Sequence, residues 1–303
     1  MNAPASSVGR FAPSPTGPLH FGSLVAALGS YLEARSRGGR WLVRMEDVDQ
    51  PRCRQEHADA ILHMLEACGF EWGGPVMVQS KRTVRYAEIL ERLKAMDAVY
   101  PCGCTRTELE NALPGVDGAP VYPGTCRNGL PAGKTARAWR LRVAGQIDFD
   151  DLVQGPQHQD LPCEVGDCVL LRADGYFAYQ LAVVVDDADQ GIDHVVRGAD
   201  LIHSTARQIY LQRLLGLPTP QYAHLPVAVD PAGQKLSKQT LAAPIDVRDP
   251  WPAMHAAAVF LGMPSPECRL ASADFWAWAR EHWSFATVPR VMSLPATNIE
   301  EQS

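Results

Sequence analysis

The stretch RFAPSPTGPLHFGS, residues 10–23, decides the fold of this chain. Residues 8–11 predict a short strand, and three prolines and a glycine force residues 12–18 into an extended loop. Apolar residues then recur at helical spacing over residues 20–36, which predicts a helix directly after the loop. A helix start in this position offers backbone N–H groups and a positive dipole end to an anion. The stretch therefore predicts an anion-binding turn between a strand and a helix.

The alternation of strands and helices continues on both sides of a different middle segment. The patterns predict a strand at 41–45, a helix at 54–68, a helix at 177–186, a strand at 194–197, a helix at 204–215 and a strand at 225–229. Residues 101–175 are rich in proline and glycine, and we interpret them as an insertion. The strand-like pieces expected in this insertion are 138–143, 147–153 and 169–172. Two helices, at 251–261 and 273–283, are expected near the end. The alternation predicts an α/β fold with a parallel sheet and ligands at the carboxyl ends of its strands.

The composition is that of a globular protein. The 303 residues include 28 Lys and Arg and 34 Asp and Glu, which gives a net charge of −6, and 46% of residues are hydrophobic. This composition excludes disordered and collagen-like chains, and no apolar run is long enough to span a membrane. No export signal is recognisable at the amino terminus, so we expect a cytoplasmic protein. An acidic chain requires a local basic surface to contact RNA, and residues 127–142 supply five basic side chains and no acid. A solvated hairpin is the alternative interpretation of that segment.

A second motif, KLSKQ at residues 235–239, lies on a glycine-containing loop after a predicted strand. Two ammonium groups on such a loop, Lys235 and Lys238, suit closure over a triphosphate and stabilisation of the departing pyrophosphate. In the first motif, His20 can donate a hydrogen bond to a phosphate oxygen, and Gly22 lets a nucleotide approach the backbone. Each motif alone would be weak, because a solvated basic loop and a polar helix cap are common.

Together, HFGS at 20–23 and KLSKQ at 235–239 resemble the two signature motifs of class I aminoacyl-tRNA synthetases. Residues 11–17, 44–49 and 177–215 resemble the catalytic domain of the glutamyl-tRNA synthetases within that class. The resemblance covers roughly residues 8–245. It implies a Rossmann-type catalytic domain and an enzyme, a ligase that activates L-glutamate with ATP and Mg²⁺. Three departures from the family pattern are Ser23 for the second histidine of the first motif, Val48 for a threonine, and RGADL at 197–201 for RGEDH.

The resemblance also divides the chain. We expect the first half of the catalytic domain at 1–100, an inserted module at 101–175 that bears zinc and resembles an acceptor-binding module, the second half with the KLSKQ loop at 176–245, and a short helical region at 246–303. That last segment is too short for the anticodon-binding domains of glutamyl-tRNA synthetases. The short form resembles the branch of glutamyl-Q tRNA(Asp) synthetases. This implies activation without tRNA, transfer of glutamate to the queuosine at the wobble position of tRNA(Asp), and a monomer without an obligate protein partner.

The charges of glutamate suggest how its site is built. Its side-chain carboxylate needs arginines, for which Arg10 and Arg197 are candidates, while Glu46 can hold the ammonium and Tyr179 can donate a hydrogen bond. By resemblance, the glutamate site consists of Arg10, Phe11, Ala12, Pro13, Ser14, Glu46, Tyr179 and Arg197. The implied ATP site consists of His20, Gly22, Ser23 and Lys238, and the implied catalytic set of His20, Gly22, Lys235 and Lys238.

Three cysteines, Cys102, Cys104 and Cys126, predict a structural zinc site in the insertion. The spacing leaves the fourth ligand open, and the family resemblance implies Tyr122. His158, Cys163 and Cys168 are an alternative source of ligands, and three free thiols are the other interpretation.

Two other functions stay open at this point. The chain could be a nucleotidylyltransferase that adenylates glutamate or another small carboxylic acid without an RNA acceptor. It could also be a non-catalytic regulatory paralogue that binds glutamate or tRNA. Exchange of pyrophosphate into ATP across a panel of acids separates these functions from the synthetase.

Overall fold

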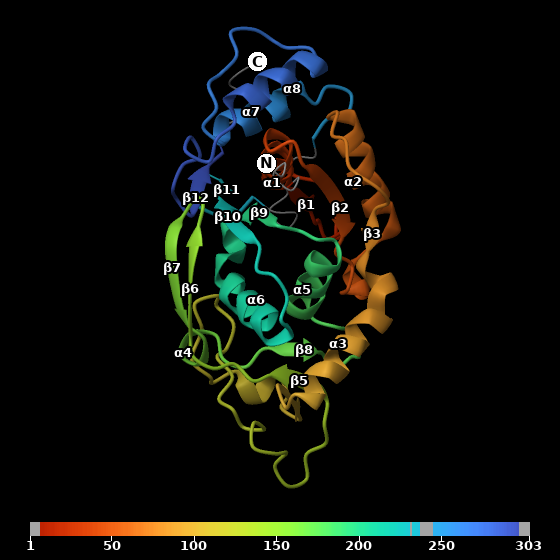
Figure 1. Ribbon diagram of the computed structural model, residues 1–303, viewed down its shortest axis with the longest axis vertical. Helices are drawn as coiled ribbons and strands as arrows, with labels where there is room; N and C mark the ends of the chain where they lie inside the picture. The colour runs from red at the N-terminus through yellow and green to blue at the C-terminus, as the bar shows by residue number, and fades with distance from the viewer. Residues whose placement is uncertain (1–6, 231, 237–244, 297–303) are drawn as a thin grey trace, which may run out of the picture.

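The computed structural model describes residues 7–230, 232–236 and 245–296, and Figure 1 shows their arrangement. Its centre is a seven-stranded sheet. In spatial order the strands are β3 (Met77–Val78), β2 (Arg40–Met45), β1 (Val8–Phe11), β9 (His194–Gly198), β10 (Gln221–Leu225), β6 (Gln146–Asp151) and β7 (Gly155–Asp160). The pairs from β3 to β6 are parallel, and only β6 and β7 pair antiparallel. The predicted α/β fold with a parallel sheet is confirmed.

Helices cover both faces of the sheet and create two cores. One core contains α1 (Phe21–Ser36), α2 (Gln55–Ala67), α7 (Trp251–Phe260) and α8 (Ser272–His282), and the other contains α3 (Thr83–Ala95), α5 (Tyr179–Asp189) and α6 (Ile202–Leu215). Successive residues of β2 alternate between them: Trp41 and Val43 pack in the first core and Leu42 in the second. Burial on both faces explains why β1 is buried throughout and why its residues do not alternate between polar and apolar.

The two carboxy-terminal helices belong to the same body as the sheet. Figure 1 shows α7 and α8 at one end of the molecule, beside α1. Trp276 lies with its ring centroid 4.7 Å from that of Tyr31 on α1, and the Trp283 indole donates a hydrogen bond to Glu33, also on α1. These contacts pack α8 and the residue that follows it against the helix that carries the first motif.

The strands of the expected insertion join two different sheets. β4 (Val99–Cys102), β5 (Ala138–Leu141) and β8 (Val169–Leu171) form a three-stranded antiparallel sheet, with the short helix α4 (Leu161–Glu164) nearby in sequence. The β6–β7 hairpin instead extends the main sheet, because Asp151 at the end of β6 pairs with Tyr222 on β10. A segment that looks like one insertion in sequence therefore also supplies a strand beside the catalytic half of the sheet.

The strand expected at 225–229 is two strands. β10 ends at Leu225, and β11 (Val227–Val229) pairs with β12 (Ser293–Pro295) in a separate two-stranded sheet. Pro226 lies between β10 and β11 and has no N–H group to continue a ladder. Single 3₁₀ turns lie at Gln50–Arg52, Gln79–Arg82, Thr107–Leu109 and Ala199–Leu201. None of the described helices is long and apolar enough to cross a membrane.

Candidate active site and metal centre

A cavity of about 270 Å³ opens at the carboxyl ends of β1 and β9. In the sheet β1 lies between β2 and β9, so the chain leaves β1 and β9 in different directions and a crevice forms between them. The sequence-predicted site residues that line this cavity are Arg10, Phe11, Ala12, Pro13, Ser14, His20, Gly22, Ser23, Glu46, Tyr179, Arg197 and Lys235. Lys238, also predicted for this site, lies outside the described residues. The fold thus brings together residues separated by more than two hundred positions.

The start of α1 forms one wall. His20 caps the helix: its Nδ1 accepts a hydrogen bond from the backbone N–H of Ser23 at 3.3 Å, and its Nε2 lies 3.2 Å from the Ser23 hydroxyl. A Cβ added to Gly22 would lie 3.3 Å from the His20 ring and 3.7 Å from the carbonyl oxygen of Leu236. The helix start and the second motif therefore approach each other across Gly22. This wall presents backbone N–H groups at a positive helix end, as an anion site requires.

The loop after β11 brings Lys235 to the mouth of the cavity. The backbone turns at Asp230, whose N–H bonds to the carbonyl of Gln234 at 2.8 Å, and Lys235 forms a bridge back to Val229. The Lys235 ammonium lies 2.5 Å from the carboxylate of Asp200, which follows β9. Both side chains are more than one third exposed, so this ion pair is weak enough to exchange for a stronger anion.

Behind the cavity, Arg10 and Arg44 share the carboxylate of Asp187 on α5. Arg10 Nε lies 3.1 Å and Arg44 Nη2 2.7 Å from Asp187 Oδ1, and Arg44 also reaches Glu46 at 3.3 Å. Burial disfavours the charge on Asp187, but the two guanidinium groups outweigh it and lower the pKa of this carboxyl. Burial raises the pKa of Glu46, against the opposing effect of Arg44 and Arg10. The cluster fixes Arg10 and Glu46 as a preformed pair of opposite charges on the cavity wall.

Arg197 is held on several sides. It donates from Nη1 to the Tyr179 hydroxyl at 3.1 Å, from Nε to His224 Nε2 at 3.0 Å, and from Nη2 to Thr205 Oγ1 at 2.9 Å and more weakly to the Leu201 carbonyl at 3.4 Å. Burial raises the pKa of Tyr179, so its hydroxyl stays protonated and can donate to a bound anion.

Four supporting residues were missed by sequence reasoning: Arg44, Asp151, Asp187 and His224. Asp187 and Arg44 lie within motifs that resemble the family, but neither spacing nor composition shows that they pair. His224 and Asp151 carry no local signal, because their contact depends on how β6 and β10 pair.

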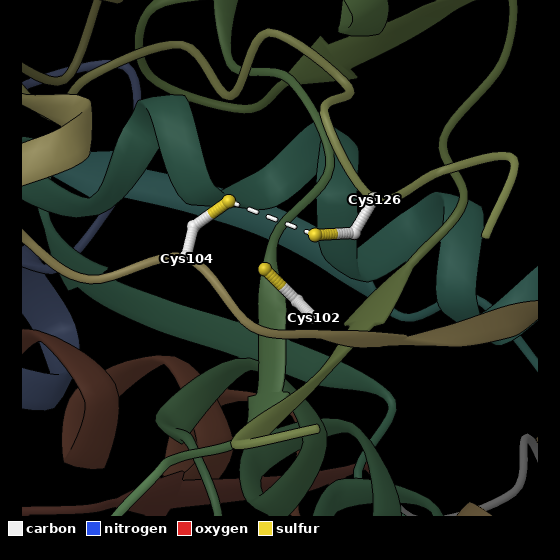
Figure 2. Close-up of side chains that lie close together, drawn as sticks. All are labelled: Cys102, Cys104 and Cys126. Carbon is white, nitrogen blue, oxygen red and sulfur yellow. Dashed lines mark hydrogen bonds between the residues drawn. The ribbon is translucent and has the colours of Figure 1, made fainter. Parts of the chain in front are cut away.

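The three cysteines of the insertion converge (Figure 2). The sulfur atoms of Cys102, Cys104 and Cys126 all lie within 4.8 Å of one another and point toward a common centre, with Cys104 and Cys126 3.7 Å apart. Sulfurs on a tetrahedral zinc ion are about 3.8 Å apart, given Zn–S bonds of roughly 2.3 Å. The Tyr122 hydroxyl lies 3.4 Å from the sulfurs of both Cys102 and Cys104. The donor set therefore fits a tetrahedral metal ion with three sulfur ligands and one oxygen ligand.

The surroundings of the cluster favour the thiolate of Cys102, whereas burial and the neighbouring thiols raise the pKa of Cys104. Cys102 and Cys126 are buried, and the Arg140 guanidinium lies 3.3 Å from Cys102 Sγ and stacks on the Tyr122 ring. Burial disfavours the Cys102 thiolate, but hydrogen bonds from Tyr122, the Cys104 backbone and Arg140 outweigh it and lower the pKa of Cys102 to about 7. In the described part of the chain this is the one group of three or more side chains suited to a metal. The alternative ligands His158, Cys163 and Cys168 do not form such a group.

Most of the basic segment at 127–142 is bonded inside its own module. Arg127 pairs with Asp167 at 2.7 Å, Lys134 pairs with Glu108, and Arg140 donates to the Asp167 carbonyl as well as to Cys102. Arg142 donates to the carbonyl of Arg127. The segment therefore stabilises the module that holds the three cysteines, and its exposed basic side chain is Arg137.

Comparisons with known proteins agree with this geometry. The model of the family "tRNA synthetases class I (E and Q), catalytic domain" matches residues 7–251. A glutamyl-Q tRNA(Asp) synthetase of Dechloromonas aromatica is 60% identical, over 98% of this chain and 100% of the relative. One of Aromatoleum aromaticum is 57% identical, over 95% of this chain and 92% of the relative.

Two solved structures have the same fold. A glutamate–tRNA synthetase from Elizabethkingia anophelis superposes with a TM-score of 0.81 at 24% identity, over 97% of this chain and 68% of that chain. A glutamate tRNA ligase from Elizabethkingia meningosepticum, in complex with its amino acid, gives 0.80 at 25% identity, over 97% and 67%. The chain belongs to the class I tRNA synthetases of the E and Q family, and within that family to the glutamyl-Q tRNA(Asp) synthetases.

Proposed function

We propose that this chain activates L-glutamate with ATP, without tRNA, and transfers the glutamyl group to the queuosine at the wobble position of tRNA(Asp). One observation carries the first half of this proposal: a single cavity holds an anion-binding helix start, the Lys235 loop and a buried set of groups complementary to glutamate. The name shared by relatives of nearly equal length supports the acceptor.

Glutamate fits the charges of the cavity. The side-chain carboxylate is assigned to Arg197 and Tyr179, which are already hydrogen-bonded to each other and so present two donors from one place. Arg10 supplies a second positive charge, held in place by Asp187. The ammonium is assigned to Glu46, whose carboxylate gains a favourable partner when glutamate binds. These assignments leave the α-carboxylate directed at ATP.

The chemistry needs no enzyme nucleophile. The α-carboxylate of glutamate attacks the α-phosphorus of ATP in line, pyrophosphate leaves, and a hydroxyl of the acceptor base then attacks the mixed anhydride as AMP departs. His20 and the α1 start hold phosphate, and Lys235 with Lys238 stabilises the negative charge that builds up on pyrophosphate. Mg²⁺ accompanies ATP, because it binds phosphate oxygens and keeps several of its waters. We expect the enzyme to act as a cytoplasmic monomer.

We also assign the cysteine cluster to zinc, with Cys102, Cys104, Cys126 and Tyr122 as ligands. The sulfur spacing and the buried hydroxyl between two sulfurs support this choice. Zinc in a closed four-ligand site stabilises a fold and takes no part in the reaction. Its role here is to hold the module around β4 and β5.

Pyrophosphate exchange into ATP tests the activation step. Purified protein is incubated with ATP, Mg²⁺ and labelled pyrophosphate in the absence of tRNA, with glutamate, glutamine, aspartate or another small acid. Exchange that depends on glutamate and exceeds that with the other acids supports the proposal. Exchange with a different acid would indicate the nucleotidylyltransferase, and no exchange with any acid would indicate a regulatory paralogue.

A further inference from the structure

A buried chain of three side chains ends on Arg197 and has no role in the account above. Asp151 Oδ2 lies 2.6 Å from His224 Nδ1, and both side chains are completely buried. On the other side of the ring, His224 Nε2 receives the hydrogen bond from Arg197 Nε at 3.0 Å. The three residues come from β6, β10 and β9, which are adjacent in the sheet.

The chemistry of the two ring nitrogens fixes the proton on His224. An arginine Nε always carries hydrogen, so His224 Nε2 has to accept, and the ring proton therefore lies on Nδ1, where Asp151 accepts it. Burial lowers the pKa of His224 to about 4, so the ring is neutral at neutral pH. One carboxylate thus selects the tautomer that can hold the guanidinium.

The hydrogen bonds of Arg197 leave one of its N–H groups for a ligand. A guanidinium has five N–H donors. Across the described residues, four acceptors take them: His224, Tyr179, Thr205 and the Leu201 carbonyl. The fifth N–H remains on Nη1, the nitrogen that also bonds Tyr179, a cavity-lining residue like Arg197 itself.

We propose that Asp151 and His224 are positioning residues that set the tautomer and orientation needed for Arg197 to bind the side-chain carboxylate of glutamate. The inference rests on the proposed function, because it presumes that Arg197 binds glutamate. It assigns no contact between Asp151 or His224 and substrate. Their effect is confined to how Arg197 is presented.

The substitution Asp151→Asn tests the tautomer directly. Asp151 Oδ1 accepts backbone N–H groups from Val153, Gln154 and His224 at 2.8–3.1 Å, so an asparagine would place its oxygen there and its NH₂ group toward the His224 ring. His224 Nδ1 would then have to accept, and its proton would move to Nε2. That proton would face the Nε–H of Arg197, and the hydrogen bond would become a repulsive contact.

Two variants of His224 separate hydrogen bonding from packing. His224→Phe keeps a planar ring and removes the hydrogen bonds of the ring to Asp151, Arg197 and Thr205. His224→Gln can accept from Arg197 with Oε1 and donate to Asp151 with Nε2, so it restores the polarity of the original chain. Tyr222→Phe is the matched control: it keeps the ring beside Arg197 and removes only the hydroxyl, which bonds to Gln212.

The experiment measures KM for glutamate and for ATP in pyrophosphate exchange, with the thermal denaturation midpoint as a check of folding. We expect Asp151→Asn and His224→Phe to raise KM for glutamate on the order of ten- to hundredfold. KM for ATP should stay unchanged, His224→Gln should recover most of the glutamate affinity, and Tyr222→Phe should behave as the wild type.

Three results overturn the inference: an unchanged KM for glutamate in folded variants, equal rises for glutamate and ATP, or a His224→Gln variant as impaired as His224→Phe. If Asp151→Asn does not fold, the comparison of the two His224 variants decides. Failure of the proposed function looks different, because the wild type itself would then show no glutamate-dependent exchange, and the inference would fall with it.

Discussion

Asp187 is a carboxylate shared by two buried arginines, and its loss has a predictable cost. The side chains of Arg10 and Arg44 are 3% and 0% exposed, and both bond to Asp187 Oδ1. Replacing Asp187 with asparagine keeps the shape of the side chain but removes its charge. Arg44 then keeps its ion pair with Glu46 at 3.3 Å, while Arg10 loses the ion pair that it makes with Asp187.

The magnitude follows from the burial of the pair. Removing one partner of a buried ion pair costs about 3–5 kcal/mol, because the other charge stays buried without compensation. At about 2.1 cal/mol/K per residue, the unfolding entropy of 303 residues is ~0.6 kcal/mol/K near the transition. The cost therefore corresponds to a fall in Tm of about 5–8 °C.

Thermal denaturation at neutral pH, followed by circular dichroism, measures this fall. Asp174→Asn is the control, because Asp174 is exposed and pairs with Arg172 at the surface, where a pair contributes at most about 1 kcal/mol, or less than ~2 °C. The two arginines outweigh the effect of burial and lower the pKa of Asp187 from its ordinary value. The stabilisation is therefore fully present above that ordinary value and is lost as pH falls through the lowered pKa. A fall in Tm no larger than that of Asp174→Asn, or one that persists undiminished in strong acid, would refute the reasoning.

Three further predictions concern the metal, pH and the second motif. Tyr122→Phe should lower the amount of zinc bound per chain, measured by atomic absorption. Tyr100→Phe is the control, because it loses a hydroxyl bonded to Asp167 and should keep its zinc. Equal zinc in both variants would remove Tyr122 from the ligand set. Burial lowers the pKa of His224 from 6.5 to about 4, so as pH falls the imidazole takes up a proton in the unfolded chain before it does so in the folded one. The free energy of unfolding should therefore fall by on the order of 3 kcal/mol as pH drops from 6.5 to 4. His224→Gln should flatten that part of the pH profile in urea titrations, and an unchanged slope would assign it to other groups. Lys235→Ala should reduce kcat of pyrophosphate exchange by roughly 10²–10³ while the glutamate KM stays nearly constant; a change in KM alone would contradict its role at pyrophosphate.

Sequence reasoning succeeds here where the signal is local. The proline-rich loop at 12–18 and the helix that follows it depend on short-range sterics and periodicity, and the structure has α1 within one residue of the prediction. The helix α3 also has a local signal, with buried Tyr86, Ile89, Leu90 and Leu93 at helical spacing, although it was not predicted. Attention to that period would have found it.

The supporting residues lack such a signal, because their partners are distant in the chain. Asp187 is 177 positions from Arg10, and no sequence feature near either residue predicts their contact. A strand was expected at 147–153, where β6 lies, but β7 was not expected, and the place of β6 beside β10 depends on tertiary pairing at Asp151. Residues that line the cavity could thus be predicted by resemblance, while those that orient them required the structure.

Transfer of glutamate to tRNA tests the central claim most directly. The purified protein is incubated with labelled glutamate, ATP and Mg²⁺, together with tRNA(Asp) that either carries or lacks queuosine. We predict acid-precipitable label only with the queuosine-containing tRNA. Label on neither tRNA while glutamyl-adenylate still forms, or equal label on both, would contradict the account.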